Sequence, residues 1–269
     1  MTEAIIRQYR EDDIPALIEF WLENFDDTRE FVLAFYEALP KLGGAVVAEL
    51  EGKIVGASHV LSCQELSDLE GKSVALGLVY GVSVSKSSRR GGLGEKLVKA
   101  SQDLSERLGA EIFCCEPASV GLVGWYEKIS GLRSALRREK HIIKAAEYGS
   151  LTKLSAEEYS AQREEMLKGK NHVKLSPAAM DFEAHMLGCY GGSFIGNELG
   201  IAAAYMYEKR AMIRELICTP GNENRFAAEI AAAMSAEDAE YCLSSSDGGD
   251  YILADKAIAK TCIWNLSFS

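Results

Sequence analysis

The sequence predicts a mixed α/β fold, in which helices flank a mixed central sheet and a smaller, partial repeat of that arrangement follows. Two observations support this prediction. Segments with the period of strands alternate with segments of helical period along the chain, and the order hairpin, strand, glycine-containing turn, helix, strand occurs in both halves. With 269 residues, the chain is long enough for two modest domains.

The N-terminal half begins with a strand over 4–9 and a helix start at Pro15, which follows Asp12 and Asp13. An acidic N-cap and a proline in the first turn favour such a start. Apolar residues then recur at helical spacing. The same periodicities predict helices over 14–25, 28–39, 94–108 and 119–129, strands over 45–50, 54–62, 73–85 and 110–117, and a closing strand pair within 132–145.

A polar and charged segment over 147–175 separates the two halves. We therefore expect a first domain over 1–146 and a second over 147–269. Within the second half, periodicity and turn residues predict helices over 155–168 and 222–235, a hairpin over 191–209, and strands over 211–219, 239–246 and 261–268.

Composition excludes several classes of protein. The net charge is −11, from 29 basic and 40 acidic residues, and such a surface repels nucleic acid. A signal peptide and a membrane-length apolar stretch are both absent, so we expect a cytoplasmic protein with no membrane partner. The seven cysteines include no Cys-x-x-Cys pair, so neither a disulfide framework nor a metal site is expected.

A basic patch at residues 86–99 stands out against this acidic background. It has five basic residues and one acidic residue, Glu95; the basic ones are Lys86, Arg89, Arg90, Lys96 and Lys99. The patch coincides with a glycine-rich turn that leads from a strand into a helix. A helix N-terminus presents backbone N–H groups, glycines permit close approach, and basic side chains neutralise further negative charge. The turn therefore suits a pyrophosphate.

Two common nucleotide motifs do not fit this turn. A Walker loop requires Gly-Lys-Ser/Thr, and a Gly-x-Gly-x-x-Gly fingerprint from Gly92 would need a glycine at Leu97. What remains, Arg89-x-x-Gly92-x-Gly94, resembles the Arg/Gln-x-x-Gly-x-Gly/Ala signature of the GNAT superfamily of acyl-CoA N-acyltransferases. The segment WYEKISGL from Trp125 is similar to the FYEKLGF helix and turn of the same family. The resemblance covers about 1–146, and the rest only in outline.

The resemblance implies a splayed central sheet in which the fourth and fifth strands separate around the pantetheine arm of acetyl-CoA. The backbone of Val82, Ser83 and Val84 would bind this arm. Ser119 stands where relatives often carry an asparagine that touches the co-substrate. The pyrophosphate would bind to the turn residues, which are Arg89, Arg90, Gly91, Gly92, Leu93 and Gly94.

The resemblance also implies catalytic roles. Tyr126 matches the family tyrosine that protonates the departing thiolate, which needs a nearby O–H donor. The acceptor amine must lose a proton, yet the fourth strand from Tyr80 to Val84 has no carboxylate. Glu116 is the first candidate for the base and Glu49 the second, and the C-terminal carboxylate of Ser269 is the third.

We therefore expect an N-acetyltransferase in which a primary amine of a small molecule or peptide attacks acetyl-CoA directly. A catalytically silent acyl-CoA-binding or regulatory module is the alternative, because the usual glutamate is missing. An acyl-cysteine on Cys114 or Cys115 is a minor alternative. The aromatic residues near the N-terminus are expected mainly in the core, with one or two lining the acceptor pocket; they are Trp21, Phe25, Phe31, Phe35 and Tyr36.

The turn at the equivalent place in the second half, Cys218–Arg225, has a different composition. It contains one glycine, a proline that removes an N–H group, and Glu223 where an anion would bind. We expect this half to be a degenerate acyltransferase-like domain that has lost co-substrate binding. Its expected roles are to wall the acceptor pocket and to form the surface of a homodimer.

Overall fold

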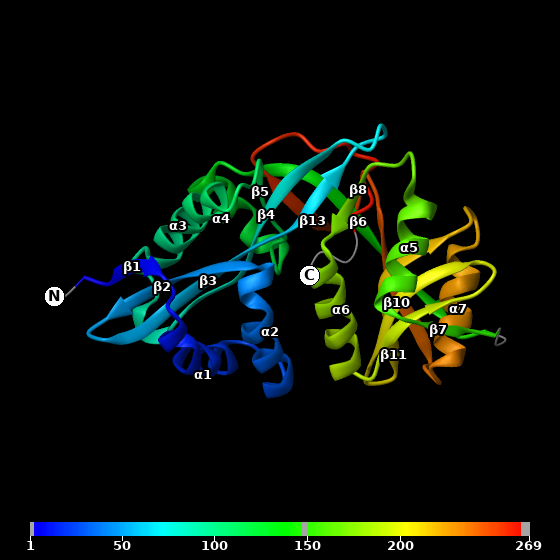
Figure 1. Ribbon diagram of the computed structural model, residues 1–269, viewed down its shortest axis with the longest axis horizontal. Helices are drawn as coiled ribbons and strands as arrows, with labels where there is room; N and C mark the ends of the chain where they lie inside the picture. The colour runs from blue at the N-terminus through cyan, green and yellow to red at the C-terminus, as the bar shows by residue number, and fades with distance from the viewer. Residues whose placement is uncertain (1–2, 147–149, 265–269) are drawn as a thin grey trace. The chain divides into compact units, whose positions relative to one another are not determined.

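The computed structural model describes residues 3–146 and 150–264 and divides into two compact units (Figure 1). Unit 1 comprises the chain up to Leu66, Ser73–Ala135 and Tyr251–Ile258. Unit 2 comprises Ser67–Lys72, Leu136–Asp250 and the described residues from Ala259 onward. The division into two related domains over 1–146 and 147–269 stays a prediction.

Unit 1 contains a mixed sheet with the strand order β1-β2-β3-β4-β5-β13. The β4–β5 pair is parallel, whereas β1–β2, β2–β3 and β5–β13 are antiparallel. The strands are β1 (Ile5–Gln8), β2 (Gly43–Leu50), β3 (Lys53–Ser67), β4 (Ser73–Val84), β5 (Ile112–Cys115) and β13 (Asp250–Ala254). The helices are η1 (Glu11–Asp13), α1 (Ile14–Asn24), α2 (Arg29–Leu42), η2 (Lys86–Ser88), α3 (Leu93–Arg107) and α4 (Val120–Ser130).

Helices cover both faces of the unit 1 sheet. Ser58 and His59 are neighbours on β3 and so point to opposite faces. The Ser58 hydroxyl is 2.8 Å from that of Ser101 on α3, whereas the His59 ring is 3.0 Å from the hydroxyl of Tyr36 on α2. The helices α3 and α2 therefore pack on opposite sides (Figure 1). This arrangement confirms the predicted mixed α/β class.

In unit 2, the sheet strands follow the order β6-β12-β11-β10-β9-β7. Its β11–β12 pair is parallel and is connected by α7, as β4 and β5 are connected by α3. The strands are β6 (Arg133–Lys144), β7 (Thr152–Leu154), β8 (His172–Leu175), β9 (Ser193–Gly196), β10 (Gly200–Tyr207), β11 (Arg210–Cys218) and β12 (Asp238–Ser244). The helices are α5 (Ala156–Leu167), α6 (Pro177–Cys189) and α7 (Glu223–Ala233).

Each unit includes a strand from the other half of the sequence. In unit 1, β13 pairs with β5, with Leu253 opposite Cys115 and Ala254 opposite Cys114. In unit 2, β6 pairs with β12 over seven residue pairs, from Asp238–Lys144 to Ser244–Arg138. The set of strands in neither unit is therefore complete within a continuous half of the chain.

A buried ion pair links helix and strand in unit 2. Arg163 on α5 donates two hydrogen bonds to Glu215 on β11, at 2.8 Å and 3.0 Å, and both side chains are fully buried. Tyr159 donates a third bond to the same carboxylate at 2.8 Å and stacks on Phe194 of β9. Buried charges of this kind persist only when they are paired and hydrogen-bonded.

Two expectations about the elements need correction. The segment 132–145 forms one long strand, β6, and not a strand pair. The strand expected over 261–268 is wrong for the described part, where Ile263 makes only an isolated bridge with His172, and residues 265–268 lie outside the described residues. The sequence reasoning also missed four elements, β7, β8, α6 and β13. Within the described residues, no helix is long and apolar enough to cross a membrane.

Candidate active site

The fourth strand continues past the end of the fifth. The parallel register runs from Leu76–Ile112 to Val79–Cys115, where β5 ends, while β4 continues to Val84. We call Tyr80–Val84 the β4 extension. It contains the three predicted backbone contacts, Val82, Ser83 and Val84, all half-buried. The end of the β4–β5 pairing corresponds to the splayed sheet that the sequence predicted.

The glycine-rich turn connects the β4 extension to α3. Arg89 donates from Nε to the carbonyl oxygen of Val84 at 3.0 Å, which ties the turn to the strand. Arg90 and Gly92 have left-handed backbones, with φ of 70° and 75°. Gly92 is the N-cap of α3, and the first helical turn begins at Leu93. The N–H groups of this turn lack carbonyl partners within the helix, and the positive end of the helix dipole lies there.

Three glycines in this turn have different surroundings. A Cβ atom at Gly92 would have no other atom within 4 Å, but the left-handed backbone disfavours any side chain. A Cβ at Gly91 would contact only the carbonyl oxygen of Ser88, at 3.8 Å. At Gly94, by contrast, a Cβ would lie 3.2 Å from the indole ring of Trp125. The open surroundings of Gly91 and Gly92 fit an approaching phosphate.

The basic patch is smaller than the sequence suggested. Lys96 pairs with Glu3, and Lys99 pairs with Glu95 at 2.7 Å. These pairs neutralise the two lysines on α3. The basic side chains that belong to the turn itself are Lys86, Arg89 and Arg90, all exposed.

Tyr126 lies beside the end of the β4–β5 pairing. Its side chain is 8% exposed and belongs to an apolar cluster with Val79 and Cys115, the last residue pair of the parallel register. Val82 of the β4 extension packs against the same cluster. Burial raises the pKa of the Tyr126 phenol, with a smaller contribution from Cys115. The phenol is therefore protonated at neutral pH and can act as a proton donor.

Glu116 and Ser119 follow directly after β5. Glu116 is half-buried and adjoins Cys115, whereas Ser119 is exposed and is the N-cap of α4. The structure thus brings Tyr126, Glu116, Ser119 and the β4 extension to one end of the β4–β5 pair.

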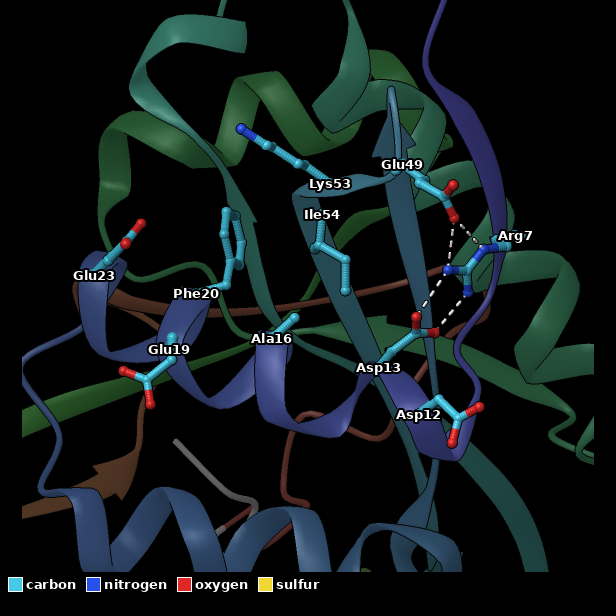
Figure 2. Close-up of a pocket in the computed structure, with 11 residues that line it drawn as sticks. Arg7, Asp12, Asp13, Ala16, Glu19, Phe20, Glu23, Glu49, Lys53 and Ile54 are labelled. Atoms are coloured by element: carbon cyan, nitrogen blue, oxygen red, sulfur yellow. Dashed lines mark hydrogen bonds and ion pairs between the residues drawn. The ribbon is translucent and has the colours of Figure 1, made fainter.

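Glu49 belongs to a different place in unit 1. It accepts two hydrogen bonds from Arg7, at 2.7 Å and 2.9 Å, and Arg7 also binds Asp13. These residues line a cavity of about 420 Å³ whose walls come from β1, η1, α1, β2 and β3 (Figure 2). Figure 2 also shows Phe20 of α1 and Ile54 of β3 lining it. This ion-paired position does not favour Glu49 as the base.

The remaining catalytic candidates have distinct positions. Ser269 lies outside the described residues. Cys114 and Cys115 are buried, and burial raises the pKa of both thiols, which disfavours a nucleophilic thiolate. Within the described residues, no group of three or more His, Cys, Asp and Glu side chains could hold a metal ion.

The aromatic residues of α1 and α2 lie mainly in the core, as predicted. Of the five named from the sequence, Trp21, Phe31, Phe35 and Tyr36 are buried, and Phe25, the C-cap of α1, is half-buried. Their rings pack around His59 of β3 and Tyr80 of the β4 extension.

Sequence reasoning missed two residues beside Tyr126. Leu253 of β13 is fully buried in the Tyr126 cluster, and Tyr251 packs against it. The available signal was the short apolar run from Tyr251 to Ala254, bounded by Asp250 and Asp255.

The turn in unit 2 uses an N–H group that an anion would need. The Glu223 carboxylate accepts a hydrogen bond from the backbone N–H of Gly221 at 3.2 Å. Asn222 is the N-cap of α7.

The fold is that of the GNAT acyltransferases. Residues 5–128 match the family model for the acetyltransferase (GNAT) domain. These residues are therefore a GNAT acetyltransferase domain. A search of the curated proteins found no match.

Solved structures share the fold over both halves of the chain. A GCN5-related N-acetyltransferase from Kribbella flavida is 14% identical with a TM-score of 0.69, over 94% of this chain and 71% of that one. A conserved protein from Enterococcus faecalis V583, a probable N-acyltransferase, is 11% identical with a TM-score of 0.69, over 94% and 72%. A GCN5-related N-acetyltransferase from Anabaena variabilis is 13% identical with a TM-score of 0.66, over 93% and 72%.

Proposed function

We propose that the protein is an N-acetyltransferase that binds acetyl-CoA along the β4 extension and transfers the acetyl group to a primary amine of a small molecule or peptide. The observation that carries this proposal is the continuity of the site. Strand β4 continues past β5 from Tyr80 to Val84 and leads through the glycine turn to the N-terminus of α3. Strand backbone beyond the end of its pairing with β5 suits the amides of pantetheine, and the helix N-terminus suits the pyrophosphate.

In the proposed reaction, the amine nitrogen attacks the thioester carbonyl carbon directly. The C–N bond forms and the C–S bond breaks. Glu116 takes the proton that the amine loses, and the Tyr126 hydroxyl gives a proton to the departing thiolate. The position of both residues at one end of the β4–β5 pair supports these roles.

A catalytically silent acyl-CoA-binding module remains the second candidate. One observation favours it: the β4 extension contains no carboxylate, and Glu49 is engaged by Arg7. Turnover with any amine would exclude this candidate.

For the second half, we propose a degenerate acyltransferase-like domain without co-substrate binding. The hydrogen bond from Gly221 to Glu223 supports this, because the carboxylate uses an N–H group that a phosphate would need. The roles of this half in walling the acceptor pocket and in forming a homodimer stay predictions. We also propose a cytoplasmic location, which is supported by seven cysteines that are all present as thiols.

Calorimetry with acetyl-CoA tests the binding site. The wild type should bind, and Gly92→Asp should abolish binding, because it places bulk and negative charge where the phosphate would lie. Gly188→Asp on α6, outside the proposed site, is the matched control and should bind like the wild type, since a Cβ there has no other atom within 4 Å. Unchanged affinity in Gly92→Asp would remove the basis of the proposal. Measurement of CoA release over a panel of amines then separates an enzyme from a silent module.

A further inference from the structure

A buried tyrosine and histidine form a hydrogen-bonded chain that reaches the backbone of β4. His59 on β3 is 1% exposed and Tyr36 on α2 is 2% exposed. The hydroxyl of Tyr36 is 3.0 Å from Nε2 of His59. On the other side of the ring, Nδ1 is 3.3 Å from the carbonyl oxygen of Tyr80. The chain thus connects α2 through β3 to the first residue of the β4 extension.

The chemistry of these groups fixes the direction of both hydrogen bonds. A carbonyl oxygen can only accept, so Nδ1 of His59 carries the proton and donates it to Tyr80. In a neutral ring Nε2 then has a lone pair and accepts from the hydroxyl of Tyr36. Burial lowers the pKa of His59 to about 4, so the ring is neutral at neutral pH. The tyrosine therefore holds the histidine in the tautomer that binds the strand.

The accepted carbonyl lies at a bend in the strand. Gly81, the next residue, has a left-handed φ of 57°. A Cβ atom at position 81 would lie 3.1 Å from the Trp21 ring and 3.2 Å from Nδ1 of His59, so the space is filled. The rings of Trp21 and Phe35 pack on both His59 and Tyr80, with centroids 5.2–5.8 Å apart. Close packing on this side leaves the bend little freedom.

The bend coincides with the end of the β4–β5 pairing. Val79 is the last residue of β4 that pairs with β5, so Tyr80 is the first that β5 does not hold. His59 belongs to β3, which lies on the opposite side of β4 from β5. His59 therefore supplies a fixed hydrogen-bond donor to β4 at the point where its pairing with β5 ends. A strand without such support would be free to change direction over the next residues.

We propose that His59 is a positioning residue for acyl-CoA, which holds the Tyr80 carbonyl and so fixes the backbone of Val82–Val84 in its binding orientation. This inference rests on the proposed function, because it assumes that acyl-CoA binds along the β4 extension. Tyr36 acts one step further away, through the tautomer of His59. A purely structural histidine would instead contribute to stability alone.

Two variants separate these roles. The amide nitrogen of asparagine can occupy the place of Nδ1, whereas the longer glutamine reaches the place of Nε2. His59→Asn therefore keeps a donor for Tyr80 and loses the contact with Tyr36. His59→Gln keeps a contact for Tyr36 and loses the donor for Tyr80. Both should lower the melting temperature, because each breaks one bond of a buried chain.

Calorimetry with acetyl-CoA and thermal melting give the decisive comparison. We expect His59→Asn to bind within about threefold of the wild type and His59→Gln to bind about tenfold more weakly, the effect of one lost hydrogen bond. Equal affinity of the two variants, whether unchanged or lowered in step with stability, would overturn the inference. A wild type that does not bind acetyl-CoA would contradict the proposed function itself, and this inference with it.

Nitrogen NMR of the wild type tests the same inference without any variant. The His59 ring should show a proton on Nδ1, and its nitrogen shift should move when acetyl-CoA is added, because the accepting carbonyl belongs to the binding strand. A ring protonated on Nε2, or an Nδ1 shift that acetyl-CoA leaves unchanged, would count against the role of His59.

Discussion

The indole ring of Trp125 packs so closely on Gly94 that a Cβ atom at position 94 would lie 3.2 Å from its Cζ2 atom. This contact holds α4 against the first turn of α3. Tyr126, the next residue on α4, is thereby placed in its cluster with Val79 and Cys115. Gly94, the second glycine of the turn motif, thus serves helix packing, while Gly92 serves the backbone conformation.

Gly94→Ala should therefore disturb Tyr126 through Trp125. The added methyl group pushes the indole by a few tenths of an ångström, and we expect turnover and melting temperature both to fall. Gly188→Ala on α6, where a Cβ has no other atom within 4 Å, is the matched control. Combining Gly94→Ala with Trp125→Phe removes the benzo ring that makes the contact and should restore part of the turnover. A Gly94→Ala enzyme with normal turnover would show that α4 tolerates the displacement.

Tyr126→Phe tests the proposed proton donor. Without the hydroxyl, turnover should fall by roughly 10²–10⁴-fold if the phenol donates its proton in the transition state. The affinity for acetyl-CoA should stay nearly constant, because the phenyl ring still fills the cluster. Steady-state CoA release and calorimetry measure the two quantities separately. Equal turnover in the variant would leave Tyr126 with a packing role only.

Much of unit 1 could be predicted from the sequence because its signals are local. Helical spacing, the N-cap region before Pro15 and the glycine turn each lie within one short segment. In unit 2, the helix α6 has a local signal of the same kind, since the Ser176 side chain caps it before Pro177. The turn and Tyr126 were found because a family motif marks them.

Features that depend on distant pairing could not be predicted. The strand β13 is a short apolar run whose partner β5 lies well over one hundred residues earlier, and no local periodicity indicates that pairing. The hydrogen-bonded chain Tyr36–His59–Tyr80 likewise depends on contacts between segments that are distant in sequence. Its three members belong to three elements, and their spacing in sequence carries no information about contact.

The stability of the protein should fall as the pH falls from about 6.5 to about 4, in part because of His59. The folded-state pKa is about 4, below the ordinary value of 6.5, so the unfolded chain binds a proton in this window that the folded chain does not. Between pH 7 and pH 5, His59 should lower the free energy of unfolding by roughly 2 kcal/mol. The desolvation of the buried ring is the cause.

Urea unfolding of the wild type and of His59→Gln at pH 7 and pH 5 measures this contribution. The wild type should lose more stability than the variant on acidification, because the variant has no group to protonate at position 59. Carboxylates with lowered pKa, such as Asp13, contribute equally to both proteins and cancel in the comparison. Identical pH dependence in the two proteins would refute the assignment.

The ion pair between Arg163 and Glu215 should be important for the stability of unit 2. Glu215→Gln leaves the buried guanidinium without its counter-charge, and we expect a loss of about 3–5 kcal/mol. The exposed pair of Lys209 and Glu237, at 2.9 Å, is the matched control, and Glu237→Gln should leave the melting temperature nearly unchanged. A similar, small effect of both substitutions would show that water reaches Arg163.

The exchange of strands between the two halves predicts that neither half folds alone. A fragment of residues 1–149 lacks β13, so β5 becomes an edge strand and the cluster around Tyr126 loses Leu253. The two bonds between Phe113 and Asp255 are lost as well. A fragment of residues 150–269 lacks β6, the partner of β12. We expect both fragments to aggregate or to melt far below the full chain, and the second not to bind acetyl-CoA.

Extending 1–149 with residues 250–258 should restore part of the lost stability, because this segment supplies β13. Soluble 1–149 that melts like the full chain would show that β13 contributes little to unit 1, and tight binding of acetyl-CoA by 150–269 would contradict the degenerate second domain.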